Sequence, residues 1–295
     1  MFKEFLKKRK TQEIEHIKNL DNSDSIFSKT LITVEINLTE LCNRKCVFCP
    51  RIDPKIYPNR NLNIEIELIE KIAQNLKKNN FKGRISFSGF GEPLLHKSFK
   101  EIVKKMRNYL PKNNLETNTN GDKLSPQFIR EIFDCGLTNM YINCYDNESQ
   151  ISNFEKMIKE SGVNKSNFFI RPHWENYHKN YGLFLNNRSG MILLESNEYL
   201  KPINKPYKKR CFYPFYKMLI DYNGDVLFCS NDWGRKIIVG NAKNQDLEKI
   251  WLSENLNRIR KKLMNKDRSH SPCNTCSIDG ELHGRKSFDY LKNYL

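Results

Sequence analysis

Three cysteines lie within eight residues of one another, as Cys42, Cys46 and Cys49 in the stretch CNRKCVFCP. Thiolates spaced C-x3-C-x2-C on one loop can converge on a single metal centre. A structural zinc site needs four ligands, and His96 is distant in sequence. Three thiolates instead suit a 4Fe–4S cluster in which one iron keeps a position open to a substrate or cofactor. Three buried structural cysteines are the remaining alternative.

A second group of cysteines lies toward the C-terminus: Cys211, Cys229, Cys273 and Cys276. Four thiolates can close either an auxiliary 4Fe–4S cluster or a tetrahedral zinc site, and the cysteines alone allow both. Cys135 precedes a helix-ending glycine and Cys144 alternates with apolar residues, so we expect both in the core. Because no signal peptide is recognisable, the nine cysteines indicate metal or redox chemistry rather than disulfides.

Alternating strand and helix patterns predict the elements that position these cysteines. We expect strands at 33–38, 84–88, 114–118, 137–144 and 167–171, separated by helices with apolar residues at helical spacing. Ser98 with Glu101 reads as a capping box, and Ser125-Pro126 as a helix start. Repeated strand–helix units predict an α/β fold of partial (β/α) barrel type, with its site at the strand C-termini.

Three regions are expected along the chain. Residues 1–30 predict an amphipathic helix that docks on the body or, less favoured, on a membrane surface through the residues Phe2, Phe5, Leu6, Ile14, Ile17 and Leu20. Residues 31–204 form the barrel, with an irregular insertion at 173–204. Residues 205–295 form a small second domain, with a hairpin turning at Asn223-Gly224 and a helix at 247–263.

The composition, with 38% hydrophobic and 28% charged residues, is that of a globular protein, and no window is apolar enough to span a membrane. We therefore expect a cytoplasmic protein. The formal net charge of +16 raises the alternative of a zinc-stabilised nucleic-acid-binding protein. The basic residues are spread along the chain, however, so a small polar, anionic substrate is favoured over nucleic acid.

The stretch CNRKCVFCP, directly after a predicted strand, resembles the signature of the radical S-adenosylmethionine (SAM) superfamily. Two further stretches match in order within about residues 31–172: SGFGEP at 88–93 resembles the family's glycine–glutamate motif, and Thr119-Asn120-Gly121 its TNG turn. The resemblance implies a 4Fe–4S cluster on Cys42, Cys46 and Cys49 whose open iron binds SAM. A flavodoxin- or ferredoxin-type donor would reduce it, and a 5′-deoxyadenosyl radical would abstract hydrogen from the substrate.

The same resemblance implies which residues bind SAM: Phe48, Gly89, Gly91, Glu92, Asn120, Asn143 and Arg171. Phe48 matches the aromatic position beside the adenine, and Glu92 the partner of the SAM ammonium. Asn143 resembles the residue that contacts the ribose. Arg171 would hold the SAM carboxylate or a substrate oxygen, with an ordinary surface salt bridge as the alternative.

The second cysteine group resembles the start of a SPASM domain, the auxiliary-cluster domain that follows many radical SAM barrels. No cysteine follows Cys276, so the resemblance implies the shortened twitch form, with one auxiliary 4Fe–4S cluster. The spacing is similar to that of radical SAM dehydrogenases and epimerases of sugars and aminocyclitols. Asn231 and Asp232 fall where such enzymes contact substrate. Asp232 would accept a hydroxyl proton, or it would simply cap a turn.

The favoured function is oxidation of an alcohol carbon in a sugar, nucleotide sugar or aminocyclitol. An epimerase usually needs a thiol hydrogen donor, and both lone cysteines are expected in the core. A peptide-modifying enzyme is disfavoured because about thirty residues precede the first predicted strand and four cysteines close the chain. Polar and aromatic residues near the insertion are expected to face the substrate, unless the segment is only a linker: Arg171, His173, Trp174, Tyr177, His178, Asn186, Asn187 and Arg188.

Overall fold

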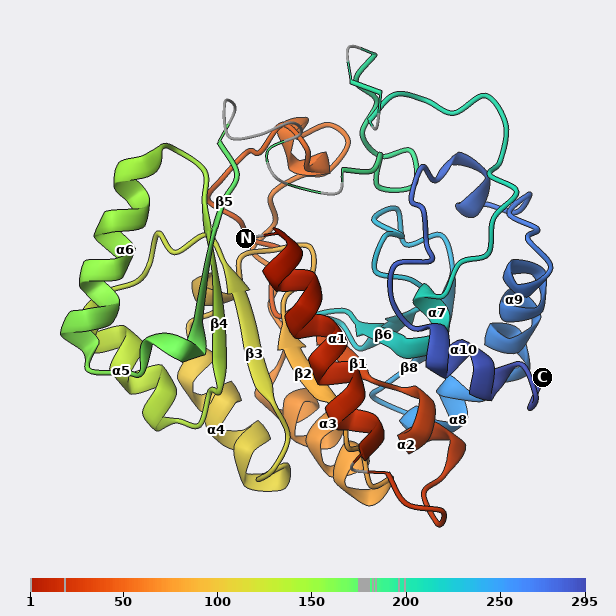
Figure 1. Ribbon diagram of the computed structural model, residues 1–295, viewed down its shortest axis with the longest axis horizontal. Helices are drawn as coiled ribbons and strands as arrows, with labels where there is room; N and C mark the ends of the chain where they lie inside the picture. The colour runs from red at the N-terminus through yellow and green to blue at the C-terminus, as the bar shows by residue number, and fades with distance from the viewer. Residues whose placement is uncertain are drawn as a thin grey trace.

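The computed structural model describes residues 2–18, 20–174, 181, 183, 185–195, 197, 198 and 200–295, with the backbone alone for residues 2–6 and 8. Within these residues an eight-stranded sheet has the order β5-β4-β3-β2-β1-β6-β7-β8. Neighbours from β5 to β6 pair in parallel, and β6, β7 and β8 pair antiparallel. The predicted α/β fold class is confirmed (Figure 1).

The strands lie within a few residues of the predicted ranges. Their bounds are Thr33–Ile36 (β1), Arg84–Phe87 (β2), Leu115–Thr119 (β3), Asn139–Cys144 (β4), Phe168–Pro172 (β5), Lys217–Ile220 (β6), Asp225–Leu227 (β7) and Ile238–Asn241 (β8). Asn143 on β4 is in register with Arg171 on β5. Met140 and Ile142 are fully buried in the core, so Asn143 faces the opposite side, as the alternation predicted.

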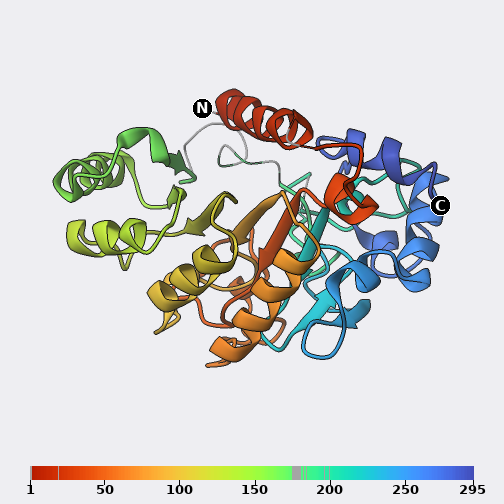
Figure 2. The same ribbon diagram turned by 90° about the horizontal axis from the view of Figure 1, so that it is seen from below.

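Amphipathic helices follow the first four strands and cover the outer face of the sheet (Figure 2). Their bounds are Ile66–Lys78 (α3), Phe99–Tyr109 (α4), Pro126–Asp134 (α5) and Glu148–Ser161 (α6). Each buries one apolar stripe, as in α3 with Leu68, Ile69, Ile72, Ala73 and Leu76. Ser125 caps α5 as predicted, but the Ser98 capping box is wrong, because the Ser98 side chain makes no capping bond to α4.

Helix α1, Phe2–Lys18, lies across the opposite side of the sheet (Figure 2). It docks through charged groups, because Arg9 pairs with Glu116 of β3 at 2.9 Å through both guanidinium nitrogens. His16 is buried, whereas Ile14 is 47% exposed. The prediction of an apolar docking face is therefore wrong at Ile14: the interior of the barrel is polar and takes a polar partner. The side chains of Phe2, Phe5 and Leu6 lie outside the described residues.

The C-terminal part of the chain joins the same sheet. Strand β6 pairs in parallel with β1, with Leu219 opposite Glu35, and the predicted hairpin is formed by β6 and β7. The sequence predicted β6 only as a hairpin strand and did not reveal its parallel pairing with β1. The remaining helices are Ile26–Thr30 (α2), Tyr213–Tyr216 (α7), Leu247–Trp251 (α8), Glu254–Met264 (α9) and Arg285–Leu291 (α10). The single helix predicted at 247–263 is wrong, because Ser253 is extended and caps α9.

None of the helices in the described part of the chain is long and apolar enough to cross a membrane.

Candidate active site

The first cysteine loop follows β1 at the C-terminal end of the sheet. The amide of Cys42 donates to Oδ1 of Asn59 at 2.9 Å, and that of Cys49 to the carbonyl of Cys46 at 3.0 Å. Burial raises the pKa of Cys46 to about 12, and the neighbouring Cys49 and Cys42 thiols raise it further. The three thiols thus influence one another, which is compatible with ligands of one cluster.

The second loop, after β2, brings its backbone into direct contact with the first. Gly89 has φ +144°, which favours glycine, and a Cβ on Gly91 would overlap the carbonyl oxygen of Thr39. The amide of Glu92 donates to the carbonyl of Leu41 at 2.7 Å, one residue before Cys42. The two loops therefore form one surface around the three thiols.

Glu92 is buried and links the second loop to the third. Its Oε1 accepts from Oγ1 of Thr119 at 2.7 Å and the amide of Leu94 at 3.1 Å, and its Oε2 from the amide of Asn120 at 2.8 Å. Burial raises the pKa of Glu92 to about 7, and these donors oppose the rise. A positively charged ligand group beside Glu92 would stabilise the carboxylate, so the position fits the SAM ammonium.

The third and fourth loops are held to the first by Asn120 and by residues that the sequence analysis did not single out, which are Asn43, Arg44, Asp122 and Asp146. Nδ2 of Asn120 donates to Oδ1 of Asn43 at 2.8 Å. Arg44 makes two bonds to Asp122, at 2.6 and 2.7 Å, and two to Asp146, at 2.6 and 2.9 Å. A guanidinium suits this double recognition because its donors form a planar fork. The only sequence signal was an arginine between cysteines, with aspartates after two strands.

A pocket of about 330 Å³ opens beside the first cysteine loop, lined by Arg44, Lys45, Cys46, Val47, Phe48, Tyr145, Asp146, His173, Trp174 and Tyr181. The Phe48 and Tyr181 rings lie 5.3 Å apart. Asn143 donates to the carbonyl of Thr119 at 3.1 Å, and its Oδ1 lies 3.2 Å from Nε2 of His173. Burial lowers the pKa of His173 to about 4. Flat aromatic faces beside amide and imidazole groups suit a planar base carrying a hydroxylated sugar.

Arg171 faces the interior of the barrel. Its Nη2 donates to Oδ1 of Asn118 at 2.6 Å, and its guanidinium lies 5.2 Å from the Tyr141 ring. Burial lowers its pKa to about 10. It lines a cavity of about 290 Å³ with other inward-facing polar residues: Glu35, Arg84, Ser86, Ser88, Glu116, Asn118 and Lys217. This interior can receive a polar molecule.

The four cysteines of the second group are buried in the C-terminal part of the chain. Its members are 5 to 9% exposed: Cys211, Cys229, Cys273 and Cys276. Burial raises the pKa of Cys229 well above its usual value, and the other three thiols raise it further. No disulfide joins any of the nine cysteines. Four buried thiols whose charges act on one another fit a thiolate-bound group such as an iron–sulfur cluster. Among the described residues no three His, Cys, Asp or Glu side chains lie close enough for a single metal ion.

Arg268 holds the second cysteine group together, and sequence reasoning missed it. The side chain is 2% exposed. It donates to the carbonyls of Lys209 at 3.0 Å, Ile278 at 2.7 Å and Asp279 at 2.7 Å. It therefore joins the segment before Cys211 to the segment after Cys276.

Asn231 and Asp232 lie two and three residues after Cys229, in different settings. The amide of Asn231 lies 3.4 Å from the Cys229 sulfur. Asp232 is fully buried and accepts from the amides of Lys236 at 3.0 Å and Ile237 at 2.9 Å. Both carboxylate oxygens thus close a turn, the second of the two roles that the sequence allowed.

The insertion reaches both cysteine groups. Nη1 of Arg188 lies 3.4 Å from Oδ1 of Asn231, and its charge acts to lower the pKa of Cys49, which burial raises. Asn187 exchanges hydrogen bonds with Ser277, next to Cys276, at 2.8 and 3.0 Å. These contacts fix the insertion to the rest of the protein, so it is more than a linker. Tyr177 and His178 lie outside the described residues.

Comparison with known proteins agrees with this arrangement. Residues 36–163 match the radical SAM superfamily, and residues 211–277 match the SPASM iron-sulfur cluster-binding domain. The S-adenosyl-L-methionine-dependent 2-deoxy-scyllo-inosamine dehydrogenase of Niallia circulans is 26% identical over 273 residues, covering 91% of this chain and 99% of the relative. A GTP 3',8-cyclase of Mesorhizobium japonicum is 26% identical over 120 residues, or 40% of this chain and 35% of the cyclase.

Among solved structures, BtrN in complex with AdoMet and 2-DOIA superposes with a TM-score of 0.69 and 22% identity, over 86% of this chain and 97% of BtrN. The fold is therefore shared. The two family matches imply a SAM-binding 4Fe–4S cluster and an auxiliary cluster. The chain belongs to the radical SAM superfamily and carries a C-terminal SPASM iron–sulfur domain.

Proposed function

We propose that the chain is a radical SAM oxidoreductase that oxidises an alcohol carbon of a polyhydroxylated substrate, a sugar, nucleotide sugar or aminocyclitol. The Niallia relative is by name a dehydrogenase of such a compound and aligns over nearly its whole length. The observation that carries the proposal is the contact of Arg188 in the insertion with Asn231, beside the second cysteine group, while the charge of Arg188 also acts on the Cys49 thiol. A substrate at Arg188 would lie between the two cysteine groups.

The geometry supports the residue roles that we propose. Cys42, Cys46 and Cys49 would hold the SAM-binding cluster, and the auxiliary cluster would be held by Cys211, Cys229, Cys273 and Cys276. When bound, the first cluster and SAM supply a 5′-deoxyadenosyl radical that takes a hydrogen atom from the substrate. Glu92, with the backbone at Gly89, Gly91 and Asn120, would orient the SAM amino acid moiety. Phe48 and Asn143 would hold the adenosine in the pocket beside Cys46.

Substrate recognition would fall to Arg171, Arg188 and Asn231. Guanidinium and amide groups suit ring hydroxyls, and the two arginines suit a phosphate or carboxylate. Because the oxygens of Asp232 already accept two backbone amides, we assign that residue to shaping its loop. A flavodoxin- or ferredoxin-type protein is the proposed electron donor.

Oxidation is favoured over epimerisation by the surroundings of the two remaining cysteines. Cys144 is fully buried in the core with Met140 and Ile142, on the face opposite Asn143. Cys135 is partly buried at the end of α5 and packs against the same core. Neither thiol lines the interior cavity or the pocket beside Cys46, where a hydrogen donor would be needed.

Iron content and SAM cleavage test the proposed cofactor sites. Reconstituted protein should hold roughly eight irons per chain, as two 4Fe–4S clusters require. The variant Cys42→Ala/Cys46→Ala/Cys49→Ala should keep about half of that iron and lose SAM cleavage. Cys135→Ala is the matched control and should match the wild type. Loss of all iron from the triple variant would contradict two independent sites.

A further inference from the structure

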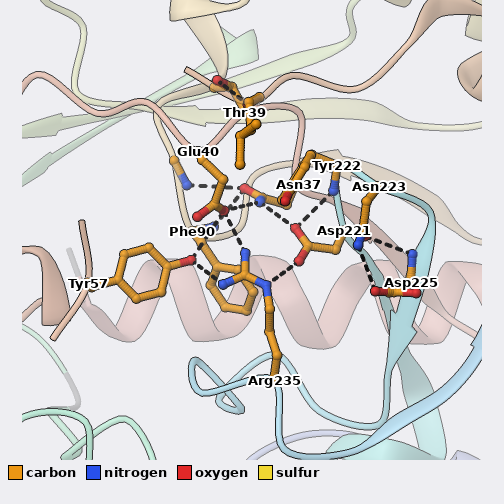
Figure 3. Close-up of polar contacts among 12 residues, drawn as sticks. Asn37, Thr39, Glu40, Tyr57, Phe90, Asp221, Tyr222, Asn223, Asp225 and Arg235 are labelled. Atoms are coloured by element: carbon orange, nitrogen blue, oxygen red, sulfur yellow. Dashed lines mark hydrogen bonds and ion pairs between the residues drawn. The ribbon is translucent and has the colours of Figure 1, made fainter. Parts of the chain in front are cut away.

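A buried ion-pair network joins the two halves of the site. It consists of Asn37, Glu40, Tyr57, Asp221 and Arg235, which we call the Arg235 junction (Figure 3). Glu40 lies two residues before Cys42, and Arg235 lies six residues after Cys229. Asp221 is fully buried and Glu40 is 5% exposed. Charges buried to this degree need several matched partners, and the junction supplies them.

One guanidinium binds three separate segments. Nη2 of Arg235 pairs with Oε1 of Glu40 at 2.6 Å, Nε pairs with Oδ2 of Asp221, and Nη1 donates to the Tyr57 hydroxyl at 2.8 Å. Glu40 precedes the first cysteine group, Tyr57 follows it, and Asp221 is the first residue after β6. Lysine carries the same charge on a single nitrogen and cannot reproduce this planar three-way contact.

Asn37 adds the glycine loop to the same network. Its Nδ2 donates to Oδ1 of Asp221 at 2.7 Å and to Oε1 of Glu40 at 3.1 Å. Its Oδ1 accepts from the amides of Phe90 at 2.9 Å and Gly91 at 3.1 Å. The Arg235 guanidinium also lies 4.8 Å from the Phe90 ring. The loop proposed to hold SAM is thereby fixed to the hairpin of the SPASM domain.

The backbone that delivers Arg235 is itself constrained. Arg235 has φ +51°, a left-handed conformation that is sterically unfavourable for a residue with a side chain. Its amide donates to the carbonyl of Asp232 at 3.0 Å, and the Asp232 carboxylate binds the next two amides. The buried Asp232 carboxylate thus holds the backbone of this turn in the conformation that directs the Arg235 side chain toward the first cysteine loop.

We propose that Arg235 is a positioning residue that sets the first cysteine loop and the glycine loop relative to the loop after Cys229. The inference rests on the proposed function, in which these loops hold the SAM-binding cluster and the auxiliary cluster. The sheet joins the two halves through β1 and β6, but both cysteine groups lie beyond the ends of these strands. The junction provides the contact between the loops themselves.

The test uses reconstituted holoprotein, with dithionite and SAM as the probes. Arg235→Gln should keep roughly eight irons per chain while the rate of SAM cleavage falls about ten- to hundredfold, the size of effect that a small misplacement causes. The electron paramagnetic resonance (EPR) response of the first cluster to SAM, and the magnetic interaction between the two reduced clusters, should change with it. Arg235→Lys should restore part of the cleavage rate.

Two further variants make the result decisive. Arg258→Gln is the matched control, because that arginine is 66% exposed and pairs only with Glu254 among the ion pairs seen; it should behave as wild type. Tyr57→Phe removes one partner of Arg235, and should shift SAM cleavage and EPR in the same direction by less. If Arg235→Gln loses its iron, Tyr57→Phe takes its place as the test variant.

If Arg235 had a purely structural role, Arg235→Gln would lower only the melting temperature of the protein. Unchanged SAM cleavage and EPR spectra in iron-replete Arg235→Gln, or in Tyr57→Phe if the former loses iron, would overturn the inference and leave the proposed function intact. Wild-type protein that holds no iron or cleaves no SAM would instead overturn the proposed function, and the inference with it.

Discussion

At the scale of single residues, the site depends on side chains that bind two or three loops at once. Glu92 joins the loops after β2 and β3, and Arg44 joins those after β1, β3 and β4. Arg268 does the same for the second cysteine group. Each side chain is ionisable and half or more buried, so its partners cannot be exchanged for water at low cost. These residues fix the geometry in which the thiols converge.

The variant Glu92→Gln tests whether a single loop-joining side chain is needed to bind SAM. Both carboxylate oxygens accept hydrogen bonds, whereas an amide has one oxygen, so its NH2 group must face one of the donors Leu94 N, Thr119 Oγ1 or Asn120 N. One buried donor left unsatisfied costs about 1–3 kcal/mol. We expect SAM affinity to fall roughly tenfold or more in iron-replete protein, measured by equilibrium dialysis. Glu101→Gln, on the exposed face of α4, is the control; equal affinity in the two variants would refute this role.

At the scale of elements, α1 closes a barrel that the strands leave open. The chain uses an ion pair for this contact because the inward-facing residues of β1, β2 and β3 include Glu35, Arg84 and Glu116. Arg84 lies 3.5 Å from the same carboxylate that Arg9 binds. An apolar helix would leave these charges without partners, which explains why the docking face is polar.

Arg9→Met is expected to destabilise the protein by about 3 kcal/mol, near the lower end of the cost of breaking a buried ion pair, because Arg84 retains part of the neutralisation. Anaerobic urea denaturation of the holoprotein measures the effect. Arg258→Met, at an exposed i,i+4 pair, should change stability by less than about 0.5 kcal/mol. Equal midpoints for the two variants would show that α1 does not depend on its ion pair.

The elements differ in how far the sequence predicts them. The five strands from β1 to β5 and the helices after them repeat a local pattern, and each cysteine or glycine motif follows a strand, so both could be predicted. The pairing of β6 with β1 and the Arg235 junction bring together residues about 180 positions apart, and no local pattern encodes such contacts. The break at Ser253 was hidden because apolar spacing continues through it. The polar face of α1 depends on what it covers.

At the scale of the whole molecule, the parts of the chain that carry the two cysteine groups are joined in one continuous sheet through β1 and β6. The radical SAM part supplies three thiols and the glycine loop, and the SPASM part supplies four thiols. Arg188 and the Arg235 junction lie between the two parts. In the proposed function a substrate bound at Arg188 would be reached from both proposed clusters, as hydrogen abstraction followed by one-electron oxidation requires.

The central claim, oxidation of an alcohol carbon, is tested most directly by following the hydrogen of that carbon. Reconstituted protein is incubated anaerobically with SAM, dithionite and a panel of aminocyclitols, sugars and nucleotide sugars, each deuterated at its carbinol carbons. The account predicts that one compound transfers deuterium to 5′-deoxyadenosine and yields one equivalent of ketone. Transfer that yields an isomer of the substrate with a solvent hydrogen in place of deuterium, or transfer from a peptide but from no member of the panel, would contradict it.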